Sequence, residues 1–558
     1  MLILNPQDKN ILEGRAKTET SSCTDTTDSS NNNALHDHHQ HAYNVPSAKT
    51  YSQYSEQTWQ GTVSHRQKTL LSREELHDSV KGLWDLIEDN SEVRPLFTQM
   101  LQQVPSVPPY DESPTGGPRL RNWTELLCAF NDQLAQGPVW LYDTPGQQGL
   151  IGFPFNALLN WSMSTPADLL VLHRPDVNAH LRDILTTYGN FLCSPASVTV
   201  LNSSLIGWLS PTALDAIVST AYLPTITTST SSEPDPGSRR TDTTADPQPR
   251  PRPQFHDLFV SNPLHPTHGF TSWNDFFTRH FRPGIRPTAS PSDDGVIVSA
   301  CESTPVALER GVKLHSEFWV KGQPYSLVTI LGEEEEEEDE NENEELREAM
   351  RFEGGTIYQS FLGALSYHRW HAPVWGVMEK VRKIQGTYFA GCPGLVARQS
   401  RHSGEGQQQG GEEEEDEQQL DPSAPDRSQR YLCQVGTRAL VYIRARDRRL
   451  GTVVFVGVGM AEVSSCEVTV REGYTVEKGE EIGMFHYGGS THCLIFEPVV
   501  WLKFIEAAEE VGIVERRGHD LNLPMDTWRK FIEIIGHTQI HETFELSKCE
   551  KVFQKCAL

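Results

Sequence analysis

The stretch FHYGGSTHCLIFEP, residues 485–498, places two glycines and Ser490 between two apolar runs of β type. Glycine weakens a strand, so a Gly-Gly pair here indicates a backbone conformation that other residues rarely adopt. Gly488 and Gly489 let the hydroxyl of Ser490 approach the preceding carbonyl carbon, which suits attack on the chain's own peptide bond. Such an attack needs a base and a group that orients the base. On these residues alone, a tight hairpin turn is the better interpretation.

Short β-like runs separated by glycine turns surround this stretch and predict a sheet. The runs are Val296–Val298, Phe318–Lys321, Tyr325–Ile330, Leu440–Ile443 and Thr452–Val458. Helical patterns flank them, with Trp273, Phe276, Phe277 and Phe281 on one face before the runs, and Trp501–Glu510 and Trp528–Ile535 after them. Residues 255–558 therefore predict an α+β domain with a mainly antiparallel sheet and flanking helices.

Residues 71–223 carry a different pattern, in which apolar residues recur every three or four positions. The recurring residues are Val80, Leu83, Leu86 and Ile87, then Trp123, Leu126, Leu127, Phe130 and Leu134, then Val177, Leu181, Ile184 and Leu185. This spacing is typical of amphipathic helices, so we expect a largely helical N-terminal domain with a core of its own. The composition of residues 224–254 predicts a linker, and that of residues 1–70 predicts a disordered tail.

The net charge of −27 is concentrated in two acidic segments. Eleven of the 13 residues from Glu333 to Glu345 are acidic, and so are all six from Glu412 to Glu417. Without these 17 charges the balance is about −10 (−27 + 17), which is ordinary for a protein of this size. We expect residues 333–348 and 400–430 to be polar surface insertions. The acidic balance argues against nucleic acid and anionic membrane surfaces as partners.

The cysteines and the hydropathy exclude several other classes. Ten cysteines occur singly without a C-x-x-C pair, so neither a zinc site nor a thioredoxin-like motif is indicated, and we expect no metal. Unpaired thiols are typical of the cytosol, so we expect a cytoplasmic protein. No run of 18 apolar residues predicts a membrane span, and the first residues lack the pattern of a secretory signal.

Two further stretches change the interpretation of Ser490. PSDDGVIVS (291–299) sets an Asp-Gly turn before a strand, and YHRWHAPVWG (367–376) places His368 and His371 three residues apart. With these, the chain resembles the phosphatidylserine decarboxylase family of pyruvoyl enzymes, which has an Asp-Gly, a Tyr-His-Arg-x-His-x-Pro block and a Gly-Ser-Thr in this order. Further agreement comes from FFTRHFRPGIRP (276–287), VKGQPYSL (320–327) and KGEEIGMF (478–485). The resemblance covers about residues 262–498 without the insertions.

The segment GGSTHCLIF (488–496) and the helical region narrow the resemblance to the fungal L-tryptophan decarboxylase branch. In the helical region GPVW (137–140), GFPFNALLNW (152–161) and STPA (164–167) carry the likeness. The chain departs from the usual pattern in two places. Val463-Ser464-Ser465 stands where Val-Gly-Ser is frequent, and Asp168 replaces a frequent glycine. Both departures leave the candidate catalytic residues intact.

The resemblance implies that the chain processes itself. Ser490 attacks the carbonyl of Gly489, with His371 as the base and Asp294 orienting it. The resulting ester eliminates to a new C-terminus at Gly489 and a dehydroalanine, which hydrolyses to a pyruvoyl group and ammonia. The resemblance implies that the two products, residues 1–489 and 490–558, stay associated because their strands share a sheet.

The same resemblance implies an amino-acid decarboxylase. The pyruvoyl ketone forms a Schiff base with the substrate's amine and accepts the electrons that the loss of carbon dioxide releases. His368 is the candidate proton donor, since an ordinary imidazole pKa of about 6.5 suits proton exchange near neutrality. Tryptophan is the expected substrate, then other aromatic amino acids, with phosphatidylserine as the alternative. The oligomeric state stays open, a homodimer included.

Three other interpretations compete with this one. A phospholipid decarboxylase shares the chemistry but has to reach a bilayer, and the acidic balance argues against it. A carrier domain of the biotinyl type fits VREGYTVEKGEEIG (470–483), but no lysine stands at the hairpin tip. A serine hydrolase is disfavoured because no Gly-x-Ser-x-Gly elbow surrounds Ser490.

Overall fold

A computed structural model describes most of the two predicted domains. It describes residues 71–107, 110–111, 119–140, 152–221, 252–316, 324–332, 344–392, 428–463, 465–487, 490–500, 502–504 and 543–546. The predicted tail, nearly all of the predicted linker, most of both insertions and the two glycines 488–489 lie outside these residues.

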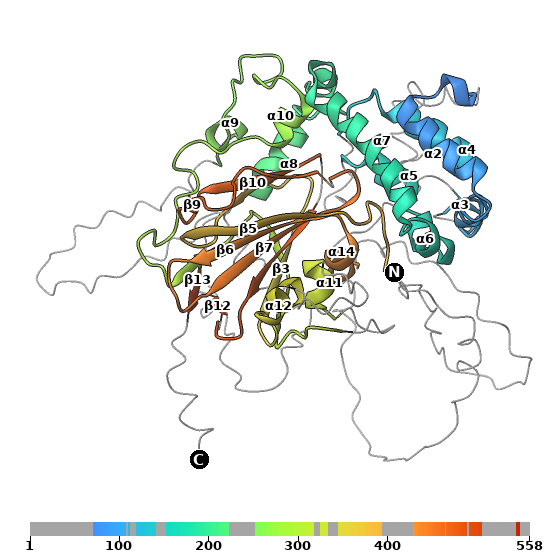
Figure 1. Cartoon of the computed structure of the whole chain (residues 1–558). Helices are drawn as coiled ribbons and strands as arrows, with labels where there is room; N and C mark the ends of the chain where they lie inside the picture. Colours follow the sequence, from blue (N-terminus) through green and yellow to red (C-terminus); the bar gives the residue numbers. More distant parts are fainter. Residues whose placement is uncertain are drawn as a thin grey trace, which may run out of the picture. The chain divides into compact units, whose positions relative to one another are not determined.

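The described residues between 71 and 221 are largely helical, as the apolar spacing predicts (Figure 1). The helices are η2 Arg73–Glu75, α2 Asp78–Asp89, α3 Val93–Gln102, α4 Trp123–Gln133, α5 Pro154–Leu159, η3 Ser162–Ser164, α6 Pro166–Val171, α7 Pro175–Cys193, η4 Pro195–Val200 and α8 Pro211–Ala221. Prolines begin α5, α6 and α7, where a missing N–H costs nothing. Helix α7 buries Val177, Leu181, Ile184 and Leu185 on one face, which confirms that part of the pattern.

The core of this helical region also contains residues from later segments. Phe255, Trp273, Phe277, Leu365, Tyr367, Phe389 and Tyr487 pack into the same apolar cluster as the buried residues of α2, α4 and α7. The expectation that the N-terminal helices bury a core of their own is therefore wrong. The motif Trp273–Phe281, which seemed to open a separate domain, instead joins the two regions.

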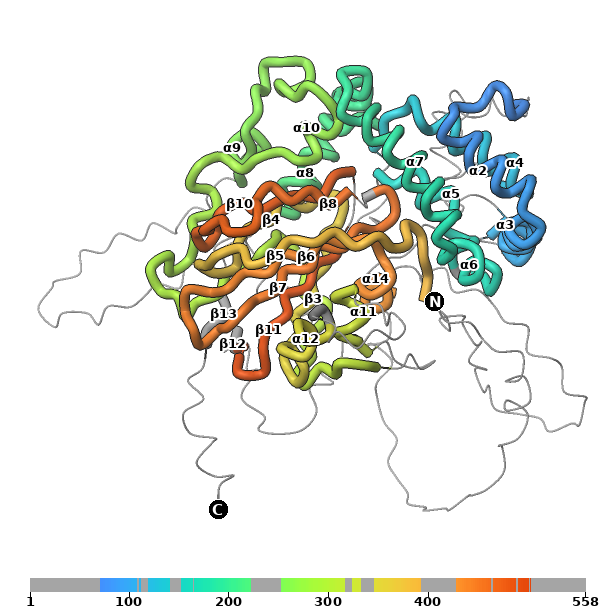
Figure 2. The backbone as a smooth tube through the Cα atoms, viewed as in Figure 1, coloured from blue at the N-terminus to red at the C-terminus, as the bar shows by residue number. Residues whose placement is uncertain are grey.

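The remaining elements form an α+β arrangement whose described strand pairs are all antiparallel (Figures 1 and 2). The helices are α9 Phe255–Leu258, α10 Trp273–Phe277, α11 Leu327–Leu331, α12 Glu344–Met350, α14 Gln429–Val435 and η5 Ala461–Val463. The strands are β1 Val296–Val298, β2 Thr304–Arg310, β3 Thr356–Leu362, β4 Arg369–His371, β5 Gly376–Ile384, β6 Arg438–Ala445, β7 Thr452–Gly459, β8 Ser465–Val468, β9 Thr475–Val476, β10 Glu481–His486, β11 Ser490–Phe496, β12 Leu502–Phe504 and β13 Thr543–Leu546.

The strands form three sheets, and the largest has β11 near its middle. Its order is β2-β3-β11-β7-β6-β5-β9, while β4-β10-β8 and β1-β13-β12 form smaller sheets. Leu494 and Phe496 of β11 pack with Trp370 of β4 and Phe485 of β10. The alternate residues of β11 pack on the other face with α11 and α14. The large sheet therefore lies between the sheet β4-β10-β8 and a layer of short helices.

Three expectations about local structure need correction or lie outside the described residues. Tyr325–Ile330, expected as a strand, contains helix α11, since a short apolar run does not separate strand from helix by its periodicity. Within the expected helix Trp501–Glu510, residues 502–504 form strand β12. The end of the first acidic insertion forms α12. The runs Phe318–Lys321 and Trp528–Ile535 lie outside the described residues.

Candidate active site

Ser490 is the first residue of β11 and lies in the interior of the large sheet. It pairs with Leu362 of β3 on one side and with Gly459 of β7 on the other. The preceding strand β10 belongs to the sheet β4-β10-β8 and does not pair with β11. Strands β10 and β11 therefore belong to different sheets and do not form a hairpin with each other. A tight hairpin turn therefore does not explain why two glycines and a serine stand at this point of the sequence.

The hydroxyl of Ser490 is buried without a hydrogen-bond partner among the described residues. The residue is fully buried, and Oγ accepts or donates no hydrogen bond there. Because side chains alternate along a strand, Ser490 shares a face with Leu494 and Phe496, which pack toward β4 and β10. An unpaired buried hydroxyl costs folding free energy, so such a group points to a chemical role.

His371 ends β4, in the sheet that covers this face. Its Nδ1 lies 2.8 Å from the carbonyl oxygen of Gly479, and its main-chain N–H donates to Ala300. A carbonyl only accepts, so Nδ1 carries the proton and Nε2 carries the lone pair of the neutral ring. Burial lowers the pKa of His371 below its usual 6.5. The neutral ring, which can accept a proton, therefore predominates at neutral pH.

His368 lies in the turn between β3 and β4. Its ring is buried and stacks on Phe277, with 4.0 Å between the ring centroids. Its carbonyl accepts a hydrogen bond of 2.9 Å from the N–H of Phe485 in β10. Leu362, the partner of Ser490 in the large sheet, ends the preceding strand. The turn that carries His368 thus starts beside Ser490.

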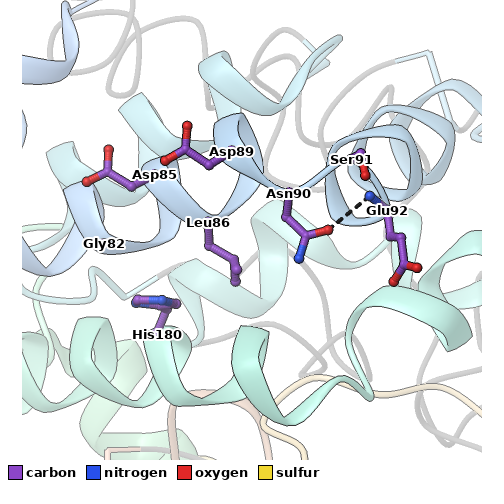
Figure 3. A pocket seen from close by; sticks show the side chains of 8 residues that line it. All are labelled: Gly82, Asp85, Leu86, Asp89, Asn90, Ser91, Glu92 and His180. Atoms are coloured by element: carbon purple, nitrogen blue, oxygen red, sulfur yellow. Dashed lines mark hydrogen bonds between the residues drawn. The ribbon is translucent and has the colours of Figure 1, made fainter.

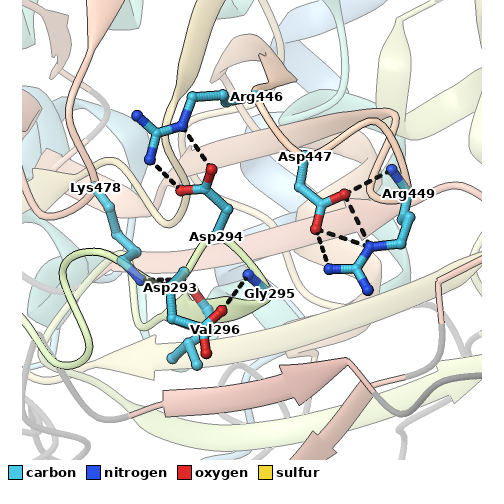
Figure 4. Close-up of polar contacts among 8 residues, drawn as sticks. All are labelled: Asp293, Asp294, Gly295, Val296, Arg446, Asp447, Arg449 and Lys478. Atoms are coloured by element: carbon cyan, nitrogen blue, oxygen red, sulfur yellow. Dashed lines mark hydrogen bonds and ion pairs between the residues drawn. The ribbon is translucent and has the colours of Figure 1, made fainter.

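Asp294 precedes β1 and forms an ion pair with Arg446. Both carboxylate oxygens accept hydrogen bonds from the guanidinium, at 2.6 and 2.5 Å (Figure 4). Lys478 holds the same loop, because its Nζ donates to the carbonyls of Ser290, Asp293 and Val296. The next residue, Gly479, accepts from His371. The structure thus links Asp294 to His371 through Lys478–Gly479, and direct orientation of His371 by Asp294 stays a prediction.

His492 stands in the quoted motif, and sequence reasoning missed it. It lies two residues after Ser490 on the same face of β11, stacked on Phe455 with 5.7 Å between centroids. Neither ring nitrogen has a hydrogen-bond partner among the described residues, and burial lowers the pKa of His492 to about 3. A neutral imidazole therefore lies beside Ser490. Alternation along the strand, applied to the motif, was the signal that could have found it.

Glu462 is a second residue that sequence reasoning missed. It follows Gly459, the β7 partner of Ser490, by three residues. Its Oε1 accepts hydrogen bonds from the N–H groups of Phe155 and Asn156, at the N-terminus of α5. Burial raises the pKa of this carboxyl to about 7. Glu462 thereby ties the GFPFN segment of the helical region to the strand end beside Ser490.

The raised pKa of Glu462 predicts a pH-dependent stability that Glu462→Gln removes. An acid whose pKa is 4.5 in the unfolded chain and about 7 in the folded protein binds its proton more tightly when folded. The free energy of unfolding therefore falls as pH rises from 4.5 to about 7, by roughly 3 kcal/mol for this group. Glutamine keeps an acceptor for α5 and carries no charge. Thermal unfolding of the wild-type protein and of Glu462→Gln at about pH 5 and about pH 7.5 checks this. An equal loss of stability in the two proteins between these pH values would contradict it.

A surface hollow lies elsewhere, between α2 and α7 in the helical region (Figure 3). Its lining residues are Gly82, Asp85, Leu86, Asp89, Asn90, Ser91, Glu92 and His180. None of the candidate residues lines it. Within the described ranges, no cluster of three metal-binding side chains occurs, and no helix has the length and apolarity needed to cross a bilayer.

Comparison with known proteins identifies the family. Residues 273–513 match the phosphatidylserine decarboxylase family, and residues 77–217 match a second family description of the same name. A decarboxylase of Amanita muscaria named iboD is 34% identical over 64% of this chain and 87% of its own length. The L-tryptophan decarboxylase of Psilocybe cubensis is 29% identical over 71% of this chain and 77% of its own length.

A third relative represents the lipid branch. Phosphatidylserine decarboxylase proenzyme 3 of Schizosaccharomyces pombe is 31% identical over 44% of this chain and 21% of its own length. The word proenzyme fits a chain that is processed before it acts. Together with the match of the motif-bearing region, these similarities show that the chain belongs to the phosphatidylserine decarboxylase family and is a pyruvoyl-dependent decarboxylase.

Proposed function

We propose that the chain cleaves itself between Gly489 and Ser490 and then decarboxylates an aromatic L-amino acid, tryptophan first. The observation that carries the cleavage site is the hydroxyl of Ser490, which is buried without a partner among the described residues and starts a strand in a different sheet from β10. This hydroxyl fits a group whose purpose is to react. By the family resemblance, the remaining roles go to His371 on β4, Asp294 in the loop before β1 and His368 in the turn after β3.

Self-cleavage begins with the transfer of an acyl group from nitrogen to oxygen. Oγ of Ser490 attacks the carbonyl carbon of Gly489 while Nε2 of His371 takes the hydroxyl proton. The proton passes to the departing amide nitrogen, the C–N bond breaks and an ester forms. A base then removes the Cα proton of Ser490, the Cβ–O bond breaks and the carboxylate of Gly489 leaves. Water hydrolyses the resulting enamine, as its imine tautomer, to the pyruvoyl group and ammonia.

The pyruvoyl group supplies an electrophilic carbonyl that draws electrons from the bound amine as carbon dioxide leaves. The chain's own residues do the rest. Ser490 lies where the apolar residues between the two sheets exclude water. His368, in the turn beside it, is the candidate that returns a proton to the substrate carbon. The proposal keeps both chains together, since β11 pairs through seven residues with β3 and seven with β7.

The substrate proposal rests on the relatives. The L-tryptophan decarboxylases of Psilocybe cubensis and Psilocybe cyanescens align with 71% and 66% of this chain. The Schizosaccharomyces pombe phosphatidylserine decarboxylase proenzyme 3 aligns with 44%. Phosphatidylserine is therefore the second candidate. We also propose a cytoplasmic location, which the seven described cysteines support because all are free thiols.

Intact-mass analysis with a substrate panel tests the proposal. Purified wild-type protein is expected as two chains, one ending at Gly489 and one starting at residue 490 with a keto group that reacts with a hydrazine. The mature protein should release carbon dioxide from L-tryptophan faster than from other aromatic amino acids. Release of carbon dioxide from phosphatidylserine vesicles, and from none of the amino acids, would instead identify phosphatidylserine as the substrate. An active preparation of a single uncut chain would contradict the cleavage.

A further inference from the structure

Tyr487 has an unusual backbone conformation at the end of β10. Its φ is +80°, in the left-handed region that residues other than glycine rarely adopt. Glycine enters this region because it lacks a Cβ, and asparagine enters it because its short polar side chain can hydrogen-bond locally. Tyrosine has neither property. A residue stays in such a conformation only where its surroundings hold it there. Tyr487 stands three residues before Ser490, so the cause of this conformation matters for the proposed cleavage.

Helix α7 of the N-terminal helical region holds the Tyr487 ring. A Cβ at Gly189 would lie 2.8 Å from the Tyr487 hydroxyl oxygen, 2.9 Å from Cε2 and 3.0 Å from Cζ. The ring therefore occupies the space that any other residue at position 189 would fill. One turn later, Sγ of Cys193 lies 3.3 Å from the same hydroxyl. Gly189 and Cys193, which we call the Tyr487 seat, thus contact the ring from one face of α7.

The residues on either side of Tyr487 are also held. The ring of His486 bonds through Nδ1 to Asn274 at 2.8 Å and through Nε2 to Glu467 at 2.7 Å. Ser490 is held by β3 and β7. Tyr487 therefore lies between two anchored positions, and its own side chain is 8% exposed.

We propose that the Tyr487 seat on α7 holds Tyr487 in its left-handed conformation and thereby positions the Gly489–Ser490 peptide for self-cleavage. Tyr487 is a positioning residue in this scheme and takes no part in the bond changes. The inference rests on the proposed cleavage at Gly489–Ser490 and gives the helical region a role in maturation. It follows from a general property of reacting groups, since a misplacement of about 1 Å can slow an intramolecular reaction about a hundredfold.

Gly189→Ala tests the seat directly. The added methyl group has to displace the Tyr487 ring, since ordinary carbon contacts lie beyond 3.4 Å. Cell-free translation of the full chain, sampled over time and resolved by mass, gives the half-time of cleavage. We expect that half-time to lengthen about tenfold or more, because releasing a strained backbone shifts the population away from the reactive geometry.

Gly82→Ala is the matched control. Gly82 also lies in a helix of the N-terminal region, and its added Cβ would meet the Nδ1 atom of His180 at 2.8 Å (Figure 3). Both substitutions bring the same methyl group against an aromatic side chain, and helix propensity favours alanine in both. We expect Gly82→Ala to cleave at the wild-type rate. A melting temperature measured for both variants separates cleavage from stability.

Variants of Tyr487 keep the test decisive if Gly189→Ala does not fold. Tyr487→Gly retains access to positive φ but loses the ring, and we expect it to slow cleavage by a similar factor. Tyr487→Phe keeps the ring and is expected to cleave within about threefold of wild type, since it loses one contact to sulfur. When Gly189→Ala and Tyr487→Gly are combined, the half-time of cleavage should be about as long as in either single variant. Both substitutions remove the same contact, so their effects should not multiply.

The outcomes separate this inference from the proposed function. If wild type cleaves and Gly189→Ala and Tyr487→Gly cleave as fast as Gly82→Ala, the seat has no role in maturation. If wild type itself stays uncut, the proposed function fails and the seat fails with it. Slow cleavage of Gly189→Ala and Tyr487→Gly, with Gly82→Ala unchanged, supports the inference.

Discussion

Ser490→Ala is expected to leave the chain in one piece and to reduce decarboxylation to background, a loss of several orders of magnitude. Alanine offers no nucleophile for the carbonyl of Gly489, and without the resulting ketone the chain has no side chain that accepts the electrons of the departing carboxylate. Intact mass gives the first result, and release of carbon dioxide from L-tryptophan gives the second.

The same substitution makes an unusual prediction about stability. The hydroxyl of Ser490 is buried without a partner among the described residues, so its removal is expected to be neutral or to stabilise the fold by about 1 kcal/mol. Ser360 is the matched control, because it is buried in the neighbouring strand β3 and its hydroxyl donates to Tyr358. Ser360→Ala, made in the uncut Ser490→Ala chain, should cost about 1 kcal/mol.

These two measurements have to agree for Ser490 to be the reacting residue. Loss of cleavage together with a large loss of stability would show that Ser490 supports the sheet, and the role would then need another serine. Ser360→Ala on its own should still cleave, since its hydroxyl faces a different partner.

Local patterns predicted most helices and strands. The spacing of Val177, Leu181 and Ile184 predicted α7, and the buried run Thr452–Gly459 behaves as the interior strand β7. The run Tyr325–Ile330 misled, because a short apolar run suits either a strand or a helix and packing against α14 decides. The local sequence does not show which strands pair with one another. That β10 and β11 join different sheets depends on contacts made far along the chain.

For the candidate site, too, the sequence predicted the segments but not the long-range contacts between them. The segments of Asp294, His371 and Ser490 came from a resemblance in motif order, and the structure places His371 on β4 and Ser490 on β11, in two different sheets. The partner of Asp294 is Arg446, 152 residues away, and Glu462 reaches Phe155, 307 residues away. No periodicity links such pairs. The positive φ of Tyr487 is also invisible in the sequence, since tyrosine is a poor residue for that conformation.

His371→Ala is expected to slow self-cleavage on the order of 10²–10⁴-fold, the usual contribution of a general base. The hydrogen bond from Nδ1 to Gly479 fixes the tautomer, so the substitution removes the lone pair on Nε2 that, in the proposed mechanism, accepts the Ser490 proton. Imidazole added to the His371→Ala chain should restore part of the rate, because it can occupy the vacated volume. Time-resolved intact mass of freshly translated protein measures both rates.

The pH dependence of cleavage gives an independent check on the same residue. Burial lowers the pKa of His371 below 6.5, so the neutral base predominates at neutral pH and is lost only in acid. Cleavage should therefore be independent of pH above 6.5 and fall at lower pH, with a midpoint below 6.5. In His371→Ala this acid limb should disappear, because the group that titrates is gone.

His280→Ala serves as the control for these measurements. His280 is a neighbouring histidine whose side chain is 57% exposed and lies 4.0 Å from Glu481, so its loss removes a nearby imidazole that does not contact Ser490. If His280→Ala and His371→Ala both cleave at the wild-type rate, the base is elsewhere. His492 then becomes the first candidate, because it lies on the Ser490 face of β11 and its pKa of about 3 keeps the ring neutral. If His492 is the base, the cleavage rate of the wild-type protein should fall only near pH 3. The pH profile of the wild-type protein is therefore enough to distinguish His492 from His371 as the base.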